Sequence, residues 1–87
     1  MLDWQHRQTK YSEEFIADGL HVSYLVYRDT AEPEWTAHML WGDPQNPEDK
    51  PIDRELYEDY EEAIAVCESY EARARKSYDV LIQEEEN

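Results

Sequence analysis

The residues whose type and spacing could support chemistry are the carboxylates between Asp53 and Glu71. This segment holds eight acidic residues and one basic residue, Arg54. On a helix, carboxylates three or four positions apart lie about 5–6 Å from one another, close to the spacing of phosphates along a nucleic-acid strand. Such a row could occupy a basic groove of a partner in place of a nucleic acid. The competing interpretation is a solvated outer face that is kept acidic for solubility.

Six acids and two tyrosines of this region form the predicted partner-binding set. Projection on a helix places the acids opposite the apolar stripe or on its flank, where a partner could reach them. The two tyrosines fall at opposite margins of the stripe; exposed tyrosines are frequent interface anchors, although a margin tyrosine also serves as a lid over a core. The set comprises Glu55, Glu58, Asp59, Glu61, Glu62, Glu68, Tyr57 and Tyr70.

Glu71 and the bases that follow it form a separate feature. Glu71 projects near the middle of the apolar stripe, and Arg75 follows four residues later in the favourable orientation for an ion pair. We expect the helix to have left the sheet at this point, so that Glu71 is in water; a contact with a partner or a second copy is the alternative. Arg73, Arg75 and Lys76 form a basic island that could pair with acids of another copy or lie in water.

Signals for catalysis or metal binding are weak. The three histidines, His6, His21 and His38, show no HxH or HxxxH spacing, and Cys67 has no CxxC partner, so no local zinc motif is present. We expect His38 to be a surface residue and Cys67 to be a buried, unreactive thiol on the apolar stripe. The two glycines lie too far apart for a phosphate-binding loop. The sequence therefore predicts no catalytic residue, no metal and no cofactor, and the protein is not expected to be an enzyme.

Length and charge exclude several classes of function. The chain has 87 residues, enough for one domain, with 22 acidic and 8 basic residues and a net charge of −14. A strongly acidic domain lacks the basic face that direct DNA or RNA binding needs, or that docking on an anionic membrane needs. Aromatic residues make up 13% of the chain, and the chain contains only two glycines. This composition favours a folded domain over a disordered acidic chain.

The same composition bears on location. No apolar run approaches the length of a transmembrane helix, and the N-terminus has no basic region followed by an apolar stretch, so no signal peptide is expected. A single cysteine cannot form an internal disulfide, which makes the cytoplasm the default compartment.

The first half of the chain, residues 1–42, is predicted to form the sheet that positions the acidic half. Residues 20–28 and 34–41 are rich in β-branched and aromatic types and alternate in polarity, and residues 29–33 have turn chemistry, so an antiparallel hairpin is expected. The residues expected on the apolar faces are Leu20, Val22, Tyr24 and Val26 in the first strand, and Trp35, Ala37, Met39 and Trp41 in the second.

The residues upstream suggest a third strand. Residues 11–17 would place Tyr11, Glu13, Phe15 and Ala17 on one face, and Asp18-Gly19 is a favoured hairpin dipeptide. A helix over residues 10–17 is the alternative. Residues 1–9 are either a fourth strand or a loose arm.

The second half is predicted to be a loop followed by one long helix. Residues 43–52 contain three prolines and are expected to form a loop without regular structure. Residues 53–84 are expected to form an acidic amphipathic helix that starts at Asp53 or at Asp59, and residues 85–87 a frayed acidic tail. The apolar stripe comprises Leu56, Tyr60, Ala63, Ile64, Cys67, Ala74, Tyr78, Leu81 and Ile82.

These elements define an α+β domain covering residues 1–87, with a three-stranded antiparallel meander packed on one C-terminal helix and the N-terminal segment as an optional fourth strand. A helix of about 30 residues would span about 45 Å, which is longer than three short strands cover. One end should therefore project, or pack on another copy or a partner.

In size, charge and the acidic 53–71 helix, the chain resembles the small acidic inhibitors that phages make against host defences, such as anti-CRISPR proteins and other DNA mimics. The resemblance rests on no family motif. It implies a host cytoplasm as location, and a basic protein as partner, such as a Cas complex or a nuclease whose nucleic-acid-binding surface is occupied. Two alternatives are an immunity protein or antitoxin that neutralises a basic toxin, and a structural module that forms a homodimer.

Overall fold

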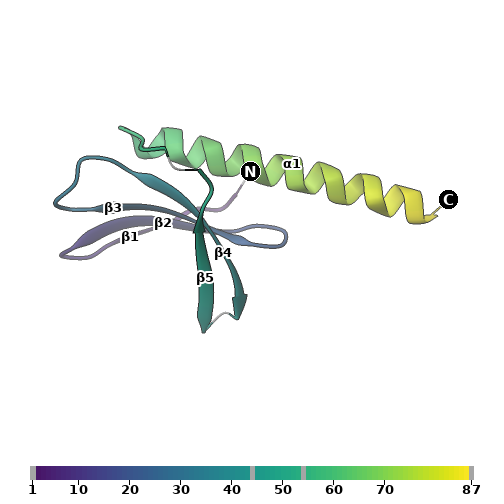
Figure 1. Ribbon diagram of the computed structural model, residues 1–87, viewed down its shortest axis with the longest axis horizontal. Helices are drawn as coiled ribbons and strands as arrows, with labels where there is room; N and C mark the ends of the chain where they lie inside the picture. The colour runs from purple at the N-terminus through teal and green to yellow at the C-terminus, as the bar shows by residue number, and fades with distance from the viewer. Residues whose placement is uncertain (1, 44, 54, 87) are drawn as a thin grey trace.

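Five strands and one helix make up the fold. The computed structural model describes the backbone of residues 2–43, 45–53 and 55–86, and the side chains among them up to residue 77 except residue 43. The strands form one antiparallel sheet in the order β1-β2-β3-β4-β5, and helix α1 packs on one face (Figure 1). The α+β class, the meander and the long C-terminal helix are confirmed. The elements are β1 (Gln5–Gln8), β2 (Ser12–Asp18), β3 (Ser23–Asp29), β4 (Thr36–Asp43), β5 (Asn46–Pro51) and α1 (Tyr60–Glu86).

The core lies between the sheet and the helix. Alternate residues of a strand point to opposite faces, and the apolar set of β3 and β4 turns toward α1, as the alternation predicted. From the helix, a narrow apolar row meets this face. The buried apolar residues of the core are Leu2, Ala17, Tyr24, Val26, Trp35, Ala37, Ala63 and Cys67.

Two alternatives were left open for the N-terminal segment: strand or helix near residues 10–17, and strand or arm for residues 1–9. Residues 12–18 form a strand and not a helix, and β1 is a fourth strand whose Gln5 pairs with Ile16 of β2. The predicted turn is present, since the Gly19 amide donates to the Val22 carbonyl oxygen at 2.8 Å. Two residues assigned to apolar faces, Tyr11 and Leu20, lie outside the strands and are exposed, because each stands at a turn.

The prediction of a loop over residues 43–52 was wrong, because Asn46–Pro51 forms the edge strand β5. The Ile52 amide donates to the Ala37 carbonyl oxygen at 2.9 Å, so in this antiparallel register the even-numbered amides of β5 face β4. Pro47 and Pro51 therefore stand at positions whose amides would face away from the sheet, where a missing N–H costs no ladder bond.

The helix starts after Asp59, and the alternative start at Asp53 was wrong. Residues 55–59 are not helical; instead Tyr57 forms an isolated β-bridge with Trp35 through two backbone hydrogen bonds of 2.8 and 3.0 Å. The paired backbone keeps this segment extended up to Asp59, whose carbonyl oxygen accepts from the Glu62 amide at 3.2 Å. Leu56 consequently leaves the predicted apolar stripe and is 62% exposed.

The C-terminal part of α1 projects past the sheet, as its length predicted. The helix contacts β3 and β4, while the β4–β5 hairpin turns away from it (Figure 1). Helix geometry continues through Glu86, so the tail that was expected to fray from residue 85 is helical at residues 85 and 86; residue 87 lies outside the described residues. The stripe residues Tyr78, Leu81 and Ile82 lie outside the described side chains. In the described part of the chain, no helix is both long and apolar enough to cross a membrane.

Candidate protein-binding surface

Five of the six predicted acids lie together on the outside of the molecule. They occupy the extended segment before α1 and the cap and first turn of the helix, and all five are exposed. Among the described residues, none of them forms an ion pair. We call this set the acidic surface: Glu55, Glu58, Asp59, Glu61 and Glu62.

Tyr57 holds the extended part of the acidic surface in place. Besides its backbone bridge to Trp35, its hydroxyl donates to Oδ2 of Asp53 at 2.5 Å, and Oδ1 of Asp53 accepts from the Glu55 amide at 3.2 Å. Burial and the bond to Asp53 raise the pKa of Tyr57 to about 12. The half-buried ring is therefore a positioning residue beneath the surface, and not the exposed anchor that its place at the stripe margin suggested.

The helix end explains part of the acidity. Asp59, Glu61 and Glu62 stand at the cap and first turn of α1, where a negative charge is stabilised by the helix dipole by about 0.3–1 kcal/mol each. That gain offsets the repulsion between neighbouring carboxylates, which is a few tenths of a kcal/mol per pair. Glu55 and Glu58 precede the helix and have no such local reason to be acidic.

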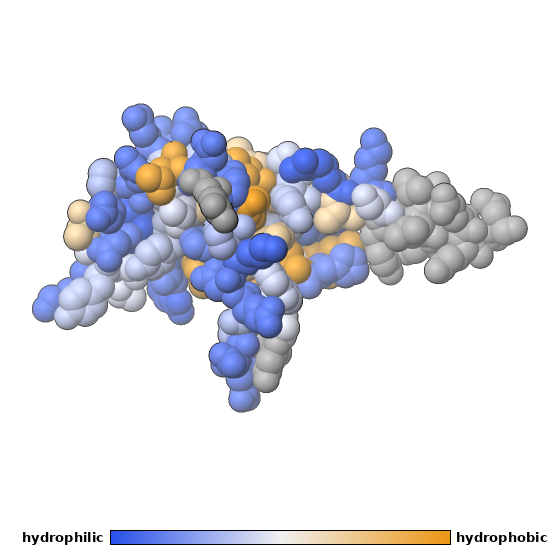
Figure 2. Space-filling model, viewed as in Figure 1, coloured by the Kyte–Doolittle hydropathy of each residue, from blue (hydrophilic) through white to orange (hydrophobic). Residues whose placement is uncertain are grey.

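A cleft beside Leu56 joins a second acidic segment to this surface. The cleft has a volume of about 220 Å³, and apolar atoms interrupt the hydrophilic surface near the start of α1 (Figure 2). Its acidic wall comes from the end of β3 and the β3–β4 connection. The lining residues are Tyr27, Arg28, Asp29, Glu32, Glu34, Thr36 and Leu56.

The basic residue among these lining residues is already engaged by its own chain. Nη1 of Arg28 donates to the Glu32 carbonyl oxygen at 3.0 Å, and its guanidinium lies over the Trp35 ring at 5.3 Å from the centroid. Sequence reasoning missed this cleft because it placed Leu56 on the helix stripe. The available signal was the Asp59 cap, which leaves Leu56 outside the helix between two glutamates.

The structure does not bring Glu68 and Tyr70 to the acidic surface. Glu68 is half-buried and accepts a hydrogen bond from Nε1 of Trp4 at 3.1 Å, which ties the N-terminal arm to the helix. Tyr70 packs against the core, with Arg73 at 5.7 Å from its ring centroid. Beyond Glu62 the exposed positions of the next turns are the uncharged Ala65, Ser69 and Ala72, so the acidic row is short.

Glu71 is buried, and the expectation that it is in water was wrong. Its side chain is 6% exposed; Oε1 accepts from the Tyr24 hydroxyl at 2.9 Å, and Oε2 accepts from the Leu20 amide at 2.9 Å and from Nε of Arg75 at 2.7 Å. Burial alone would raise the pKa of Glu71, but these three hydrogen bonds outweigh it and lower the pKa. The β2–β3 turn reaches the helix here, and the predicted pair with Arg75 is present.

His38 belongs to a hydrogen-bonded row that sequence reasoning missed. Its Nδ1 lies 2.9 Å from Oδ1 of Asp49 and its Nε2 lies 2.7 Å from Oγ1 of Thr36. The order hydroxyl, imidazole, carboxylate is that of a hydrolytic triad. Oγ1 of Thr36, however, also donates to the Tyr27 carbonyl oxygen at 3.3 Å, so its proton is directed away from the imidazole. The row ties β5 to β4.

The other candidates for chemistry were Cys67 and a metal site. Cys67 is fully buried, and burial raises the pKa of its thiol to about 12, as expected for an unreactive cysteine. The described residues contain no group of three or more His, Cys, Asp or Glu arranged to hold a metal ion.

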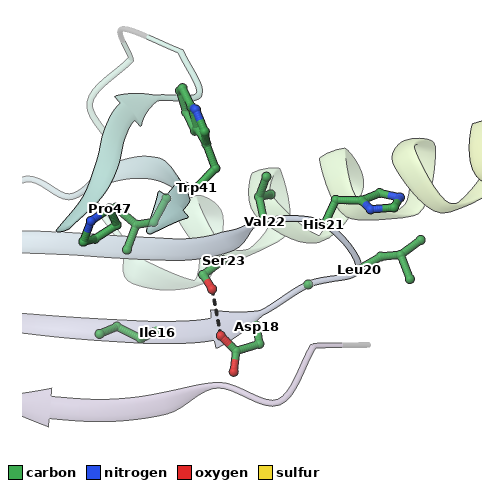
Figure 3. A pocket seen from close by; sticks show the side chains of 11 residues that line it. Ile16, Asp18, Leu20, His21, Val22, Ser23, Trp41 and Pro47 are labelled. Atoms are coloured by element: carbon green, nitrogen blue, oxygen red, sulfur yellow. Dashed lines mark hydrogen bonds between the residues drawn. The ribbon is translucent and has the colours of Figure 1, made fainter. Parts of the chain in front are cut away.

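A second cleft, of about 470 Å³, lies between the β2–β3 turn and the β4–β5 hairpin (Figure 3). Within it, Oδ1 of Asp18 accepts from the Ser23 hydroxyl at 2.7 Å, so these two polar groups satisfy each other. Ile16, Trp41 and Pro47 contribute apolar wall. The arrangement offers no activated nucleophile.

No protein-family model matches this sequence, and comparisons with curated proteins and with solved structures found no match.

Proposed function

We propose that this protein is an acidic inhibitor that occupies a basic nucleic-acid-binding surface of a partner protein, as anti-CRISPR proteins of the DNA-mimic type do. The observation that carries the proposal is the convergence of two acidic segments, distant in sequence, around the exposed Leu56. An apolar anchor inside a charged rim is typical of protein-binding surfaces. A face that served solubility alone would have no need of the anchor.

Charge explains how the partner would be recruited. A net charge of −14 creates a long-range field that steers a basic surface toward the molecule and raises the association rate. On contact, Glu55 and Glu58 meet basic side chains while Leu56 enters an apolar depression. Because the acidic row ends at Glu62, the chain blocks a local part of a binding groove and does not imitate a long duplex.

The test compares two variants of equal charge. E58K/E61K changes the acidic surface, and D3K/E48K changes exposed acids elsewhere; each carries a net charge of −10, since every Glu→Lys or Asp→Lys change adds two charges. We expect immobilised wild-type protein and D3K/E48K to capture the same basic protein from a bacterial lysate at low salt, and E58K/E61K to lose it. Added DNA or RNA should release the captured protein. Equal capture by both variants would contradict the proposal.

Leu56→Ser separates specific binding from simple ion exchange. The substitution leaves the net charge unchanged, so a purely electrostatic attachment would persist. We expect it to weaken binding by about tenfold or more, the effect of losing a buried apolar anchor. The identity of the captured protein decides between the related alternatives: a host nuclease or Cas complex supports the inhibitor, whereas a toxin supports an immunity protein.

A further inference from the structure

The face of the sheet that points away from α1 carries large apolar side chains. Helix α1 packs on one face (Figure 1), and successive residues of a strand point to opposite faces. The core residues Ala17, Val26 and Ala37 therefore place their neighbours, and every second residue from there, on the other face, which we call the open face. Four apolar residues of the open face are half-buried and lie outside the core cluster: Ile16, Leu25, Tyr27 and Leu40.

These four residues form one continuous row, which we call the apolar band. Ile16 stands directly opposite Leu25 in the register of β2 and β3. Leu25 pairs with His38 of β4, so that Leu40, two residues on, lies diagonal to it. Opposed side chains have Cβ atoms about 4.5–5.5 Å apart, and diagonal neighbours are about 7–8 Å apart. Tyr27 follows Leu25 on the same face of β3.

The band is unusual for a face that only meets water. An antiparallel sheet with one solvated face normally alternates apolar residues toward the core with polar residues toward the solvent. Here β3 places Leu25 and Tyr27 on the open face in addition to the buried Tyr24 and Val26 on the core face. Both faces of the middle strand therefore carry apolar side chains, as in a sheet that is covered on both sides.

A cleft lies at each end of the band. Tyr27 lines the cleft of about 220 Å³ together with the exposed Leu56. Ile16 and Leu40 line the cleft of about 470 Å³ beside the β2–β3 turn (Figure 3). The band thus runs from the acidic surface at the start of α1, through Leu56, to the far end of the sheet.

The charges beside the band are acidic once the pairs within the chain are set aside. Within the strands, the basic residues of the open face are Arg7, which pairs with Glu14 at 2.6 Å, and His38, which lies 2.9 Å from Asp49. A second copy of this chain would set acid against acid at this face, whereas a basic partner would be attracted to it. The acids beside the band that have no basic partner among the described residues are Asp18, Asp29 and Glu34.

We infer that the open face is a docking surface for an amphipathic helix of the basic partner, whose apolar stripe covers the band and whose lysines and arginines meet the acids beside it. The inference rests on the proposed function, because it takes the same partner and extends the same surface. A strand would have to pair at an edge of the sheet, whereas the band crosses its middle strands. A helix that lays its apolar stripe on an apolar surface is a recurrent mode of binding.

A synthetic peptide of leucine and lysine serves as the probe. In the stripe peptide, about four helical turns long, the leucines recur at helical spacing and form one stripe. In the scrambled peptide, of the same length and composition, the leucines are spread around the helix. At about 150 mM NaCl, where the Debye length is about 8 Å, we expect calorimetry to show that the stripe peptide binds the wild type about tenfold more tightly or better.

Methyl NMR spectra of the wild-type protein locate the bound peptide. We expect the methyl resonances of Ile16, Leu25 and Leu40 to shift most, because they face the peptide, and those of Val26 and Ile64 on the core side to shift least. Equal affinity for the two peptides would overturn the inference. Shifts that are confined to Leu56 at the acidic surface, or that are largest on the core side, would also overturn it.

L25T/L40T interrupts the band with a residue type that strands favour and leaves every charge in place. The matched control is Y11T, which removes a 71% exposed aromatic side chain from the β1–β2 turn, outside the band. We expect L25T/L40T to bind the stripe peptide about tenfold less tightly or worse, and Y11T to bind it as the wild type does. Wild-type affinity of L25T/L40T would contradict the inference, and the wild-type methyl shifts decide it if that variant is unstable.

The same variants separate this inference from the proposed function. E58K/E61K changes the acidic surface and keeps the band, whereas L25T/L40T changes the band and keeps the acids. If only E58K/E61K loses the protein captured from a lysate, the proposed function stands and the docking surface is wrong. If only L25T/L40T loses it, the partner docks on the open face and the acidic surface is not its site. Loss by both variants supports both proposals, and loss by neither contradicts both.

Discussion

Glu71 shows how one carboxylate can join a helix to a turn of the sheet. Its oxygens accept from the Tyr24 hydroxyl, the Leu20 amide and Arg75, so three parts of the chain meet at one charge. A buried group of this kind contributes most while it is ionised, because charge-assisted hydrogen bonds are stronger than neutral ones.

We expect Glu71→Gln to lower the free energy of unfolding by about 1–3 kcal/mol at neutral pH, the usual cost of disturbing hydrogen bonds to a buried charged group. The pKa of Glu71 is lower in the folded protein than in the unfolded chain. Its contribution is therefore full above the ordinary Glu pKa of about 4.3 and is lost as the pH falls through the folded value. Urea denaturation should show a large difference from wild type at neutral pH and a smaller one in acid.

The matched control is Glu61→Gln, which removes one exposed charge from the first helical turn. It should cost less than about 1 kcal/mol, since only the interaction with the helix dipole is lost. An equal loss of stability for Glu71→Gln at neutral and acid pH would show that the ionised carboxylate is not what holds the turn.

Gly19 leaves the space that Glu71 fills. A Cβ at this position would lie 2.5 Å from Oε1 of Glu71 and 2.7 Å from both the Tyr24 ring and the Val22 carbonyl oxygen. We expect Gly19→Ala to lower the free energy of unfolding by about 1–3 kcal/mol through overpacking, measured by thermal or urea denaturation. At Gly42 the added Cβ would meet no atom within 4 Å, but φ is +93°, so Gly42→Ala is a control for backbone strain without crowding. Wild-type stability of Gly19→Ala would mean that the turn moves away freely.

At the scale of elements, the strands β2 to β4 were predictable because their residues alternate in polarity and one face turns toward the core. Strand β5 was not, since all six of its residues are exposed and no burial pattern marks it. Its prolines pointed to a loop, yet they mark the outer edge of a sheet. The helix start was open between two caps, and only the long-range bridge between Trp35 and Tyr57 decides it.

The candidate site likewise has parts that the local sequence reveals and parts that depend on long-range contacts. The acids of the helix start were evident from their clustering in sequence. Leu56 and the acidic wall from Asp29, Glu32 and Glu34 were not, because the fold brings together two segments that are more than 20 positions apart. Glu71 was misjudged for a related reason: helical projection shows which face a residue occupies but not which turn of the sheet reaches that face.

The prolines of β5 should protect the sheet from pairing with another chain. Odd-numbered residues of β5 direct their amides outward, and two of these positions, Pro47 and Pro51, lack an N–H, which is a known means of blunting an edge strand. We expect P47V/P51V to form larger species on light scattering at high concentration, because two outward donors become available. Pro33→Val, in the β3–β4 connection, is the control and should not. Unchanged scattering for P47V/P51V would assign edge protection to the charged side chains of β5 instead.

At the scale of the whole molecule, charge is distributed unevenly. The segment from Glu55 to Ala72 contains no basic residue, and three bases follow within the next four positions. The acidic end is the surface proposed to meet a basic partner, and the basic island follows it farther along the same helix. The net charge of −14 therefore belongs to a chain whose helix is acidic at its start and basic in its middle.

The same charge should limit the stability of the fold in a way that salt reveals. Salt screens both the repulsion among 22 acids and the attraction within ion pairs. Exposed pairs such as Arg7 with Glu14 contribute only about 0–1 kcal/mol, and the pair of Glu71 with Arg75 is screened less because the Glu71 carboxylate is buried. Repulsion should dominate, so we expect the melting temperature at neutral pH to rise by several degrees between about 20 and 500 mM NaCl. Near the isoelectric point of about 4.3 the net repulsion vanishes, and the salt effect should vanish with it. A melting temperature that falls with NaCl at neutral pH would mean that local ion pairs and the helix dipole, and not the net charge, govern the electrostatics of this domain.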